Sequence, residues 1–259
     1  MVVLATHEWP PSRTDAGASA PVAVLVHGVM GWWRTWWRVG PALAAAGWRV
    51  IAVDQRGHGT SPRIDGHATI GDMAGDLAAT IERTGAPADA IIGHSLGAAV
   101  GAELAYVRPE LVRRLVLEDP PAIVRTDDLA WQFNLERELA AAHADFDGEV
   151  AREIASNPAW EEEDARQDVE GKQLADGEGI VASVRHGIGT RVPELAPILT
   201  VPTLYLLAAE DRSVFTGGAR LRLVARLPEH SGIEVMDAGH TIHRDRFDDY
   251  VAKVLAWIA

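Results

Sequence analysis

The chain has 259 residues, of which 47% are hydrophobic and 24% are charged, and its formal net charge is −13. This composition is that of an ordinary globular protein and excludes a disordered or fibrous chain. The negative charge argues against binding to nucleic acid or to anionic membrane surfaces, because both would repel the chain. Cysteine is absent, which excludes a disulfide framework and a thiolate metal site.

The first ten residues carry no basic segment followed by an apolar one, which is the pattern of a secretory signal. No apolar run approaches the roughly 18 residues that a membrane-spanning helix needs. We therefore expect a soluble protein of the cytoplasm that binds no membrane. The length is compatible with a single α/β domain.

The N-terminal part of the chain alternates between predicted strands and helices. Val2–Leu4 is typical of an edge strand, and Val22–Val26 of a buried strand that leads into His27 and Gly28. The tryptophan-rich stretch from residue 32 to residue 46 predicts a helix, and residues 48–53 predict the next strand. Residues 54–61 then predict an ordered polar turn that supports the site, and residues 72–84 predict an amphipathic helix.

A short apolar run followed by Gly-His-Ser-Leu-Gly, residues 93–97, predicts a sharp turn between a strand and a helix. The turn strains the backbone of Ser95, while Gly93 and Gly97 let neighbouring backbone approach closely. Ser95 would then lie at a helix N-terminus, where the amide of Leu96 and the helix dipole favour a developing negative charge. This context makes Ser95 a candidate nucleophile.

After a strand predicted over Leu111–Glu118, the alternation of strands and helices lapses. Only helical patterns remain, over residues 129–142, 150–155 and 164–174, and the acidic run at 161–164 is typical of a solvated helix face. We therefore predict a helical cap at residues 121–193, inserted into a core formed by residues 1–120 and 194–259. The large aromatic residues of these segments are candidate substrate contacts: Trp32, Trp33, Trp131, Phe133 and Trp160.

The alternation resumes in the last third of the chain. Strands are predicted over residues 203–208 and 233–236, and helices over residues 219–226 and 247–258. Asp211 and His240 each follow one of these strands, as Ser95 follows an earlier one. In open α/β sheets, ligands bind at the carboxyl ends of the strands.

The order Ser95, Asp211, His240, together with the Gly-His-Ser-Leu-Gly turn, resembles the α/β-hydrolase fold superfamily over nearly the whole chain. The resemblance implies a mostly parallel sheet flanked by helices. It also implies Ser95 as nucleophile, His240 as general base and Asp211 as the acid that orients the base. The backbone amides of Val29 and Leu96 would form the oxyanion hole.

Two of these assignments have alternatives in the sequence. His243 lies three residues beyond His240 but lacks a preceding glycine, so we favour His240 as the base. Glu118 and Asp119 also follow a strand, and in some relatives, including lactonases that open the zearalenone ring, the acid comes from that earlier strand. Either one is therefore an alternative to Asp211.

A serine nucleophile disfavours the epoxide hydrolases and haloalkane dehalogenases that share the fold. We expect a hydrolase that cleaves a small-molecule carboxylic ester or lactone through an acyl-enzyme, without cofactor or metal, and that takes a bulky apolar or aromatic substrate. A carbon–carbon hydrolase of ring-cleavage diketones, a low-turnover ligand receptor and a cofactor-free haloperoxidase-like enzyme are the alternatives.

Overall fold

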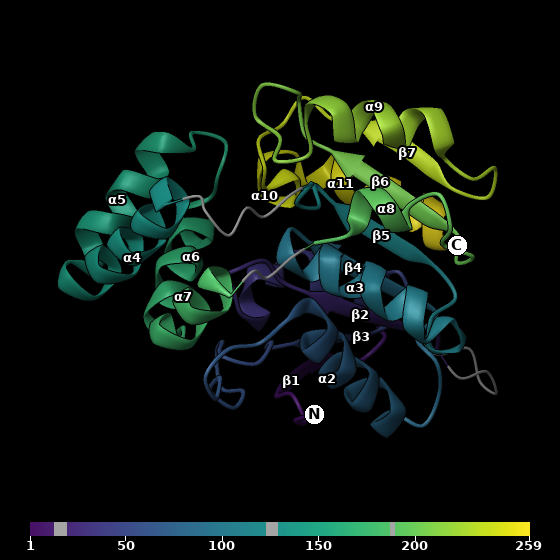
Figure 1. Cartoon of the computed structure of the whole chain (residues 1–259), viewed down its shortest axis with the longest axis horizontal. Helices are drawn as coiled ribbons and strands as arrows, with labels where there is room; N and C mark the ends of the chain where they lie inside the picture. Colours follow the sequence, from purple (N-terminus) through teal and green to yellow (C-terminus); the bar gives the residue numbers. More distant parts are fainter. Residues whose placement is uncertain (13–19, 123–128, 187–189) are drawn as a thin grey trace.

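The computed structural model describes residues 1–12, 20–122, 129–186 and 190–259, and the side chains of residues 129–131 also lie outside the description. Its centre is a seven-stranded sheet in the order β1-β3-β2-β4-β5-β6-β7 (Figure 1). Only β1 runs antiparallel to its neighbour, and the other pairs are parallel. The strands are β1 (Thr6–Trp9), β2 (Val22–Val26), β3 (Arg49–Val53), β4 (Ala90–His94), β5 (Leu115–Glu118), β6 (Thr203–Leu207) and β7 (Gly232–Val235).

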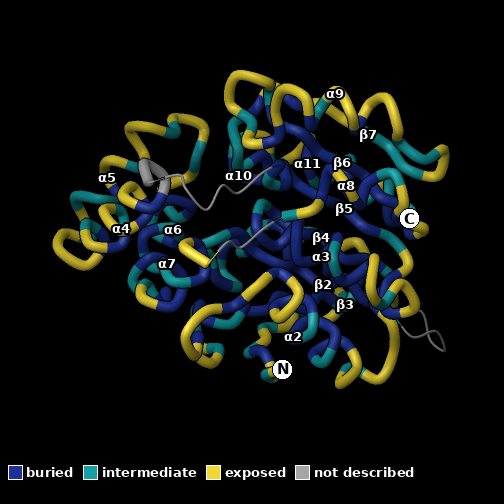
Figure 2. The backbone as a smooth tube through the Cα atoms, in the orientation of Figure 1, coloured by how far each residue is buried: buried dark blue, intermediate teal, exposed yellow. Residues whose placement is uncertain are grey.

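Helices cover both faces of the sheet, because successive side chains of the central strands point to opposite faces and both sets are apolar. Val24 packs on one face with helices α2 (Ile70–Arg83) and α3 (Leu96–Val107). Leu25 packs on the other face with α1 (Val39–Ala45) and α11 (Phe247–Ile258). Figure 2 shows the strands as the buried centre of this part of the molecule. The predicted mostly parallel sheet flanked by helices is confirmed.

Of the described helices between β5 and β6, the first four lie to one side of this layered body, and the fifth, α8 (Val192–Leu195), packs against α3 (Figure 1). The first three of them share an apolar cluster of their own that contains Ala142, Val150, Ala165 and Val169, whereas the fourth contributes Ile180 and Val184 to the cluster that includes Val24. We propose that the first four helices form the cap predicted at residues 121–193. They are α4 (Leu129–Ala144), α5 (Phe146–Ser156), α6 (Glu162–Leu174) and α7 (Gly177–Arg185), of which the sequence analysis predicted the first three.

Three local predictions differ from the structure. Val2–Leu4 is not a strand, because the backbone N–H groups of Val2 and Leu4 donate to side chains of α2, and the edge strand β1 begins at Thr6. The tryptophan-rich helix is divided into a 3-10 helix η1 (Trp33–Trp36) and α1. The strand predicted from Leu111 begins only at Leu115, after a second short helix, η2 (Pro109–Leu111).

In the described part of the chain, we find no helix with the length and apolar character needed to cross a bilayer.

Candidate active site

Ser95 lies at the sharp turn between β4 and α3. Its φ of +51° is a strained conformation for a residue with a side chain. A Cβ atom on Gly93 would lie 2.5 Å from the carbonyl oxygen of Gly97, and one on Gly97 would lie 2.1 Å from that of Val26. Both positions therefore require glycine. The Ser95 N–H donates to the carbonyl of Glu118 at 2.9 Å, which anchors the turn to β5.

His240 pairs with Asp119, the residue directly after β5. The imidazole Nδ1 of His240 lies 2.7 Å from Oδ2 of Asp119, whose side chain is fully buried. Because an ionised carboxylate only accepts hydrogen bonds, Nδ1 carries the proton in this pair. The Nε2 atom of a neutral His240 is then unprotonated and able to accept a proton.

Four donors hold the Asp119 carboxylate in place. Besides His240, these are the backbone N–H of Ala208 at 3.2 Å, the backbone N–H of Val214 at 3.0 Å and the Ser213 hydroxyl at 2.5 Å. Hydrogen bonds to a charged acceptor are stronger than neutral ones. The loop after β6 therefore fixes the carboxylate that faces His240.

Asp211 belongs to that same loop but is not near His240. Its side chain is 83% exposed, and its ion pair is with the neighbouring Arg212 at 3.8 Å. The Arg212 N–H donates to Ala209, so the chain turns at this point. The loop thus directs its backbone donors toward Asp119 and the Asp211 carboxylate toward solvent. We therefore propose Asp119, one of the two alternatives, in place of Asp211 as the acid that orients His240.

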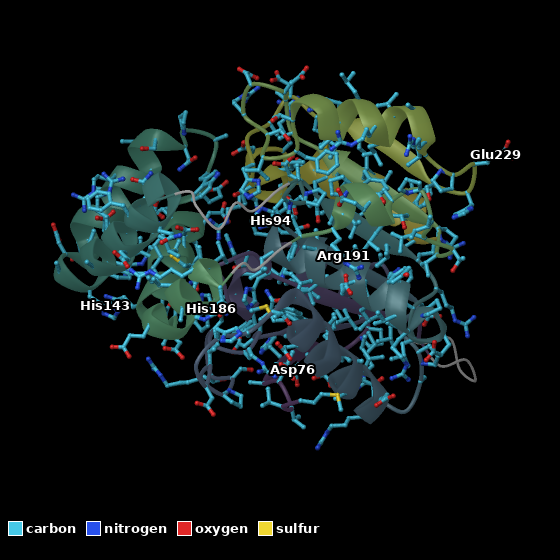
Figure 3. The ribbon with its side chains drawn as sticks, viewed as in Figure 1. Asp76, His94, His143, His186, Arg191 and Glu229 are labelled. Carbon is cyan, nitrogen blue, oxygen red and sulfur yellow. The ribbon has the colours of Figure 1, made fainter. Side chains whose placement is uncertain are left out.

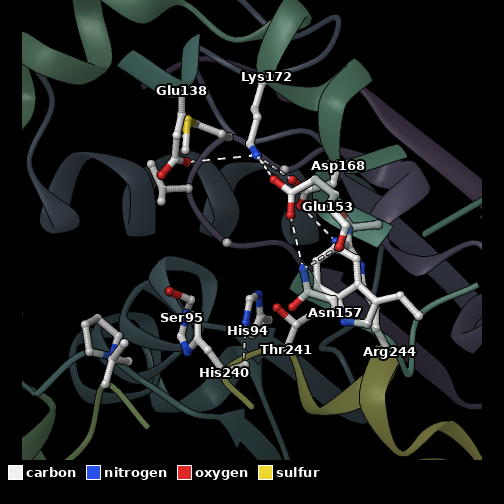
Figure 4. Close-up of a pocket in the computed structure, with 18 residues that line it drawn as sticks. His94, Ser95, Glu138, Glu153, Asn157, Asp168, Lys172, His240, Thr241 and Arg244 are labelled. Carbon is white, nitrogen blue, oxygen red and sulfur yellow. Dashed lines mark hydrogen bonds and ion pairs between the residues drawn. The ribbon is translucent and has the colours of Figure 1, made fainter. Parts of the chain in front are cut away.

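A cavity of about 560 Å³ opens above these residues, between the sheet and helices α4 to α6. Figure 4 shows Ser95 and His240 together on one side of it. Among the described residues, none forms a hydrogen bond with the Ser95 hydroxyl, which leaves it available to a substrate. Gly28, Val29 and Met30 line the cavity beside Ser95, and a Cβ atom on Gly28 would lie 3.2 Å from the Ser95 Cβ. The predicted donor Val29 N–H thus belongs to a segment next to the nucleophile, and the other predicted donor, Leu96, is the first residue of α3.

A second pair of histidine and carboxylate lies beneath the first. Glu118 accepts hydrogen bonds of 2.9 Å from the backbone N–H and from Nδ1 of His243, which belongs to the short helix α10 (Ile242–Asp245). His94 donates from Nε2 to the carbonyl of His240 at 3.1 Å. His94, labelled in Figure 3, lies at the centre of the molecule. Both carboxylates at the end of β5 therefore anchor the segment that carries His240.

Burial determines the charges in this second group. Burial lowers the pKa of His94 well below its ordinary value, with help from His240 and His243, so His94 is neutral. Burial alone would raise the pKa of Glu118, but His243, which donates two hydrogen bonds to the carboxylate, outweighs burial and holds the pKa below its ordinary value. Glu118 is therefore an anion that is fully enclosed by protein.

The polar turn at residues 54–61 supports the segment that follows β2. Asp54 accepts from the backbone N–H groups of Trp33 and Thr60. The Gln55 N–H donates to Nε2 of His27 at 3.0 Å, and Nδ1 of His27 donates to the Gly28 carbonyl. Burial lowers the pKa of His27 to about 4, so its ring is a neutral structural link.

The aromatic candidates have different positions. Trp160 lines the cavity, and its indole N–H donates to Asp245. Trp32 is buried and donates to the Gln167 carbonyl of α6, while Trp33 stacks on His7 with ring centroids 3.7 Å apart. Phe133 is 65% exposed and is not part of the cavity lining. The Trp131 side chain lies outside the described residues.

The sequence analysis missed the side of the cavity opposite Ser95. Five charged side chains line it, and we call this group the charged wall: Glu138, Glu153, Asp168, Lys172 and Arg244 (Figure 4). The expectation of an apolar, aromatic lining is therefore wrong for this side. These residues come from four separate helices, α4, α5, α6 and α10. They form a group only in the folded structure, so no sequence pattern marks them.

The turn at Ser95, the pair of His240 with Asp119 and the parallel sheet together define one class of protein. A family model described as the alpha/beta hydrolase fold matches residues 21–247. The chain belongs to the α/β-hydrolase fold family.

Comparison with individual proteins gives a range of relatives. Over 108 residues the chain is 38% identical to epoxide hydrolase B of Mycobacterium tuberculosis, a match that covers 41% of this chain but only 29% of that protein. It is 25% identical over 265 residues to the sn-1-specific diacylglycerol lipase ABHD11 of Mus musculus, covering 95% and 83% of the two chains. The solved structure of E-2-(acetamidomethylene)succinate hydrolase has a TM-score of 0.80 and 22% identity, covering 98% and 94%.

Proposed function

We propose that this protein is a serine hydrolase that cleaves a carboxylic ester or lactone through an acyl-enzyme. The observation that supports it most strongly is the buried Asp119 holding His240 at 2.7 Å, in the cavity that also exposes Ser95. Names of relatives agree with hydrolysis in general, since they include a lipase and an epoxide hydrolase. A serine at residue 95 favours acyl transfer over the epoxide chemistry of the latter.

The proposed reaction begins when Ser95 Oγ attacks the substrate carbonyl and its proton passes to Nε2 of His240. Asp119 stabilises the imidazolium that forms and keeps the ring in the required tautomer. The backbone N–H groups of Val29 and Leu96 would receive the oxyanion of the tetrahedral intermediate, which contributes about 3 to 4 kcal/mol for each donor.

Collapse of the intermediate breaks the bond to the alcohol, which leaves with the proton from His240. Ser95 is then esterified with the acyl group. A water molecule gives a proton to the now neutral His240 and attacks the acyl carbon, and the second tetrahedral intermediate releases the carboxylic acid and restores the Ser95 hydroxyl.

The test is the turnover of p-nitrophenyl butyrate by the intact chain and by Ser95→Ala. We expect steady release of p-nitrophenol that the substitution reduces to the uncatalysed rate. Release of a single equivalent would instead support a low-turnover receptor. Turnover that survives in Ser95→Ala would refute the proposal.

A further inference from the structure

The cavity that holds Ser95 has two chemically different sides. The side formed by the sheet carries Ser95, His94 and His240, and the opposite side is the charged wall (Figure 4). A substrate bound at Ser95 and extending across the cavity would contact that wall. The charge of the wall therefore helps to determine which class of substrate can bind.

The two cations of the wall already have carboxylate partners. Lys172 Nζ lies 2.5 Å from Glu153 and 2.8 Å from Asp168, and Arg244 Nη1 lies 2.8 Å from the same Asp168. The guanidinium of Arg244 also stacks over Trp160 at 4.4 Å from the ring centroid. Asp168 thus occupies the position between Lys172 and Arg244 that an anionic substrate group would need.

Glu138 is the carboxylate with the weakest pairing. Its ion pair with Lys172 is 3.9 Å long, beyond hydrogen-bond distance, since Lys172 lies closer to Glu153 and Asp168. Burial raises the pKa of Glu138, and the charges of Asp168 and Glu153 add to that effect. Among the described residues, three carboxylates face two cations on this wall, so one negative charge is in excess when all three carboxylates are ionised.

Other charges nearby do not cancel this excess inside the cavity. Arg137 and Arg152 line a neighbouring cavity beyond Glu138 and Glu153. The charge of Arg137 favours the ionised form of Glu138, but both arginines are exposed, so water screens them and the excess is offset only in part. Arg152 also pairs with Glu149. No group of side chains among the described residues is arranged to hold a metal ion, and Lys172 Nζ lies beside Glu153 and Asp168.

We propose that the substrate carries a positively charged group, an ammonium or quaternary ammonium, on the part of the molecule that reaches Glu138. This inference rests on the proposed hydrolase function. A cation beside Glu138 balances the excess charge of a partly buried wall, where charge interactions are stronger than in bulk water. An anion would face three carboxylates, and a neutral apolar group would leave the charge of Glu138 unbalanced.

The test compares esters that differ only in charge. Butyrylcholine is paired with 3,3-dimethylbutyl butyrate, in which carbon replaces the charged nitrogen. A second pair carries the charge on the acyl part of the ester: the phenyl ester of 4-(trimethylammonio)butyrate is compared with the phenyl ester of 5,5-dimethylhexanoate. Monophenyl glutarate is the corresponding anionic substrate. We expect kcat/KM to be about tenfold higher for the cation than for its neutral isostere in at least one pair, and lowest for the glutarate.

Glu138→Gln measures whether the wall is the cause. We expect it to reduce the ratio of cationic to neutral kcat/KM to about one. Glu136→Gln is the matched control, because Glu136 lies on the same helix and pairs with Arg185 outside the cavity, so its substitution removes an equal charge but keeps the ratio. Equal rates within both pairs, a preference for the glutarate, or an unchanged ratio in Glu138→Gln would overturn the inference.

The inference and the proposed function fail in different ways. If the neutral esters are hydrolysed in a Ser95-dependent manner without any cation preference, the hydrolase proposal stands and the substrate class is wrong. If no ester is hydrolysed, calorimetric titration of the Ser95→Ala protein with the same pairs still compares cationic with neutral binding. Tighter binding of the cation there supports the charge inference, and equal binding refutes it.

Discussion

Strand β5 ends in two carboxylates, and each holds a histidine, yet the two pairs differ in what surrounds them. The His240 side chain paired with Asp119 is 32% exposed and opens onto the cavity. The His243 side chain paired with Glu118 is 2% exposed and packs against Trp36 and Tyr250. The two pairs thus contain the same functional groups, but only the His240 pair is accessible to a substrate, which is why we propose a catalytic role for that pair alone.

The largest expected effect distinguishes the two histidines. His240→Ala removes the proposed general base and should lower kcat/KM about a millionfold, as loss of a triad member can. His243→Asn retains a side-chain donor for Glu118 and should lower kcat/KM by about tenfold or less, because it contacts no reacting atom. The two values of kcat/KM are measured by following ester hydrolysis over days at high protein concentration. Equal losses of kcat/KM in the two variants would show that the two histidine–carboxylate pairs do not differ in function.

The next effect concerns the carboxylate of the exposed pair. Asp119→Asn keeps the shape of the side chain but favours the wrong tautomer of His240, so we expect kcat to fall about ten thousandfold. Steady-state kinetics on a phenyl ester, with circular dichroism to verify folding, measures it. A loss below tenfold would show that another group orients His240.

Glu118→Gln should affect stability more than catalysis. Replacing a buried carboxylate that accepts two hydrogen bonds costs about 1 to 3 kcal/mol in the free energy of unfolding, whereas kcat should fall less than tenfold because Asp119 still holds His240. Urea unfolding at pH 7 measures the cost. An unchanged free energy of unfolding together with a large loss of kcat would reverse the two roles.

The pH dependence of that stability difference has a definite sign. In the folded chain, His243 outweighs the effect of burial and holds the pKa of Glu118 below the ordinary value of 4.5. The stabilisation is therefore complete above pH 4.5 and is lost as the pH falls through the folded-state pKa. Urea unfolding of both proteins from pH 7 to pH 3 should show the difference narrowing only in the acid range.

The smallest expected effect is that of Asp211→Asn. Its carboxylate is exposed and pairs only loosely with Arg212, so kcat/KM should change less than twofold and the free energy of unfolding by less than about 0.5 kcal/mol. A large loss of activity would restore the assignment made from the sequence.

These contrasts mark what the sequence could predict. The nucleophile turn depends on local spacing, since Gly93, Ser95 and Gly97 must lie in one bend between a strand and a helix. The buried strands were equally clear, because apolar runs such as Val22–Val26 have few other structures available. Helix α7 was not predicted, because Gly177 and Gly179 have low helix propensity and lie in its first turn.

The acid and the cavity wall depend on contacts between distant segments. Asp119 and Asp211 both follow strands, and only the path of the loop after β6 shows that Asp211 turns outward while Ala208 and Val214 donate to Asp119. Tryptophans near residue 32 suggested an apolar site, but Trp32 instead binds the backbone of α6. The charged wall brings together residues more than a hundred positions apart.

The rate at which a fluorophosphonate labels Ser95 tests most directly whether Asp119 and His240 activate this residue. Mass spectrometry of the intact protein and its peptides gives the rate and the site. We predict labelling at Ser95 alone, with equal rates in the unmodified protein and in Asp211→Asn, and a rate roughly a thousandfold lower in Asp119→Asn. No adduct at Ser95, or a slow rate in Asp211→Asn with a normal rate in Asp119→Asn, would contradict the account.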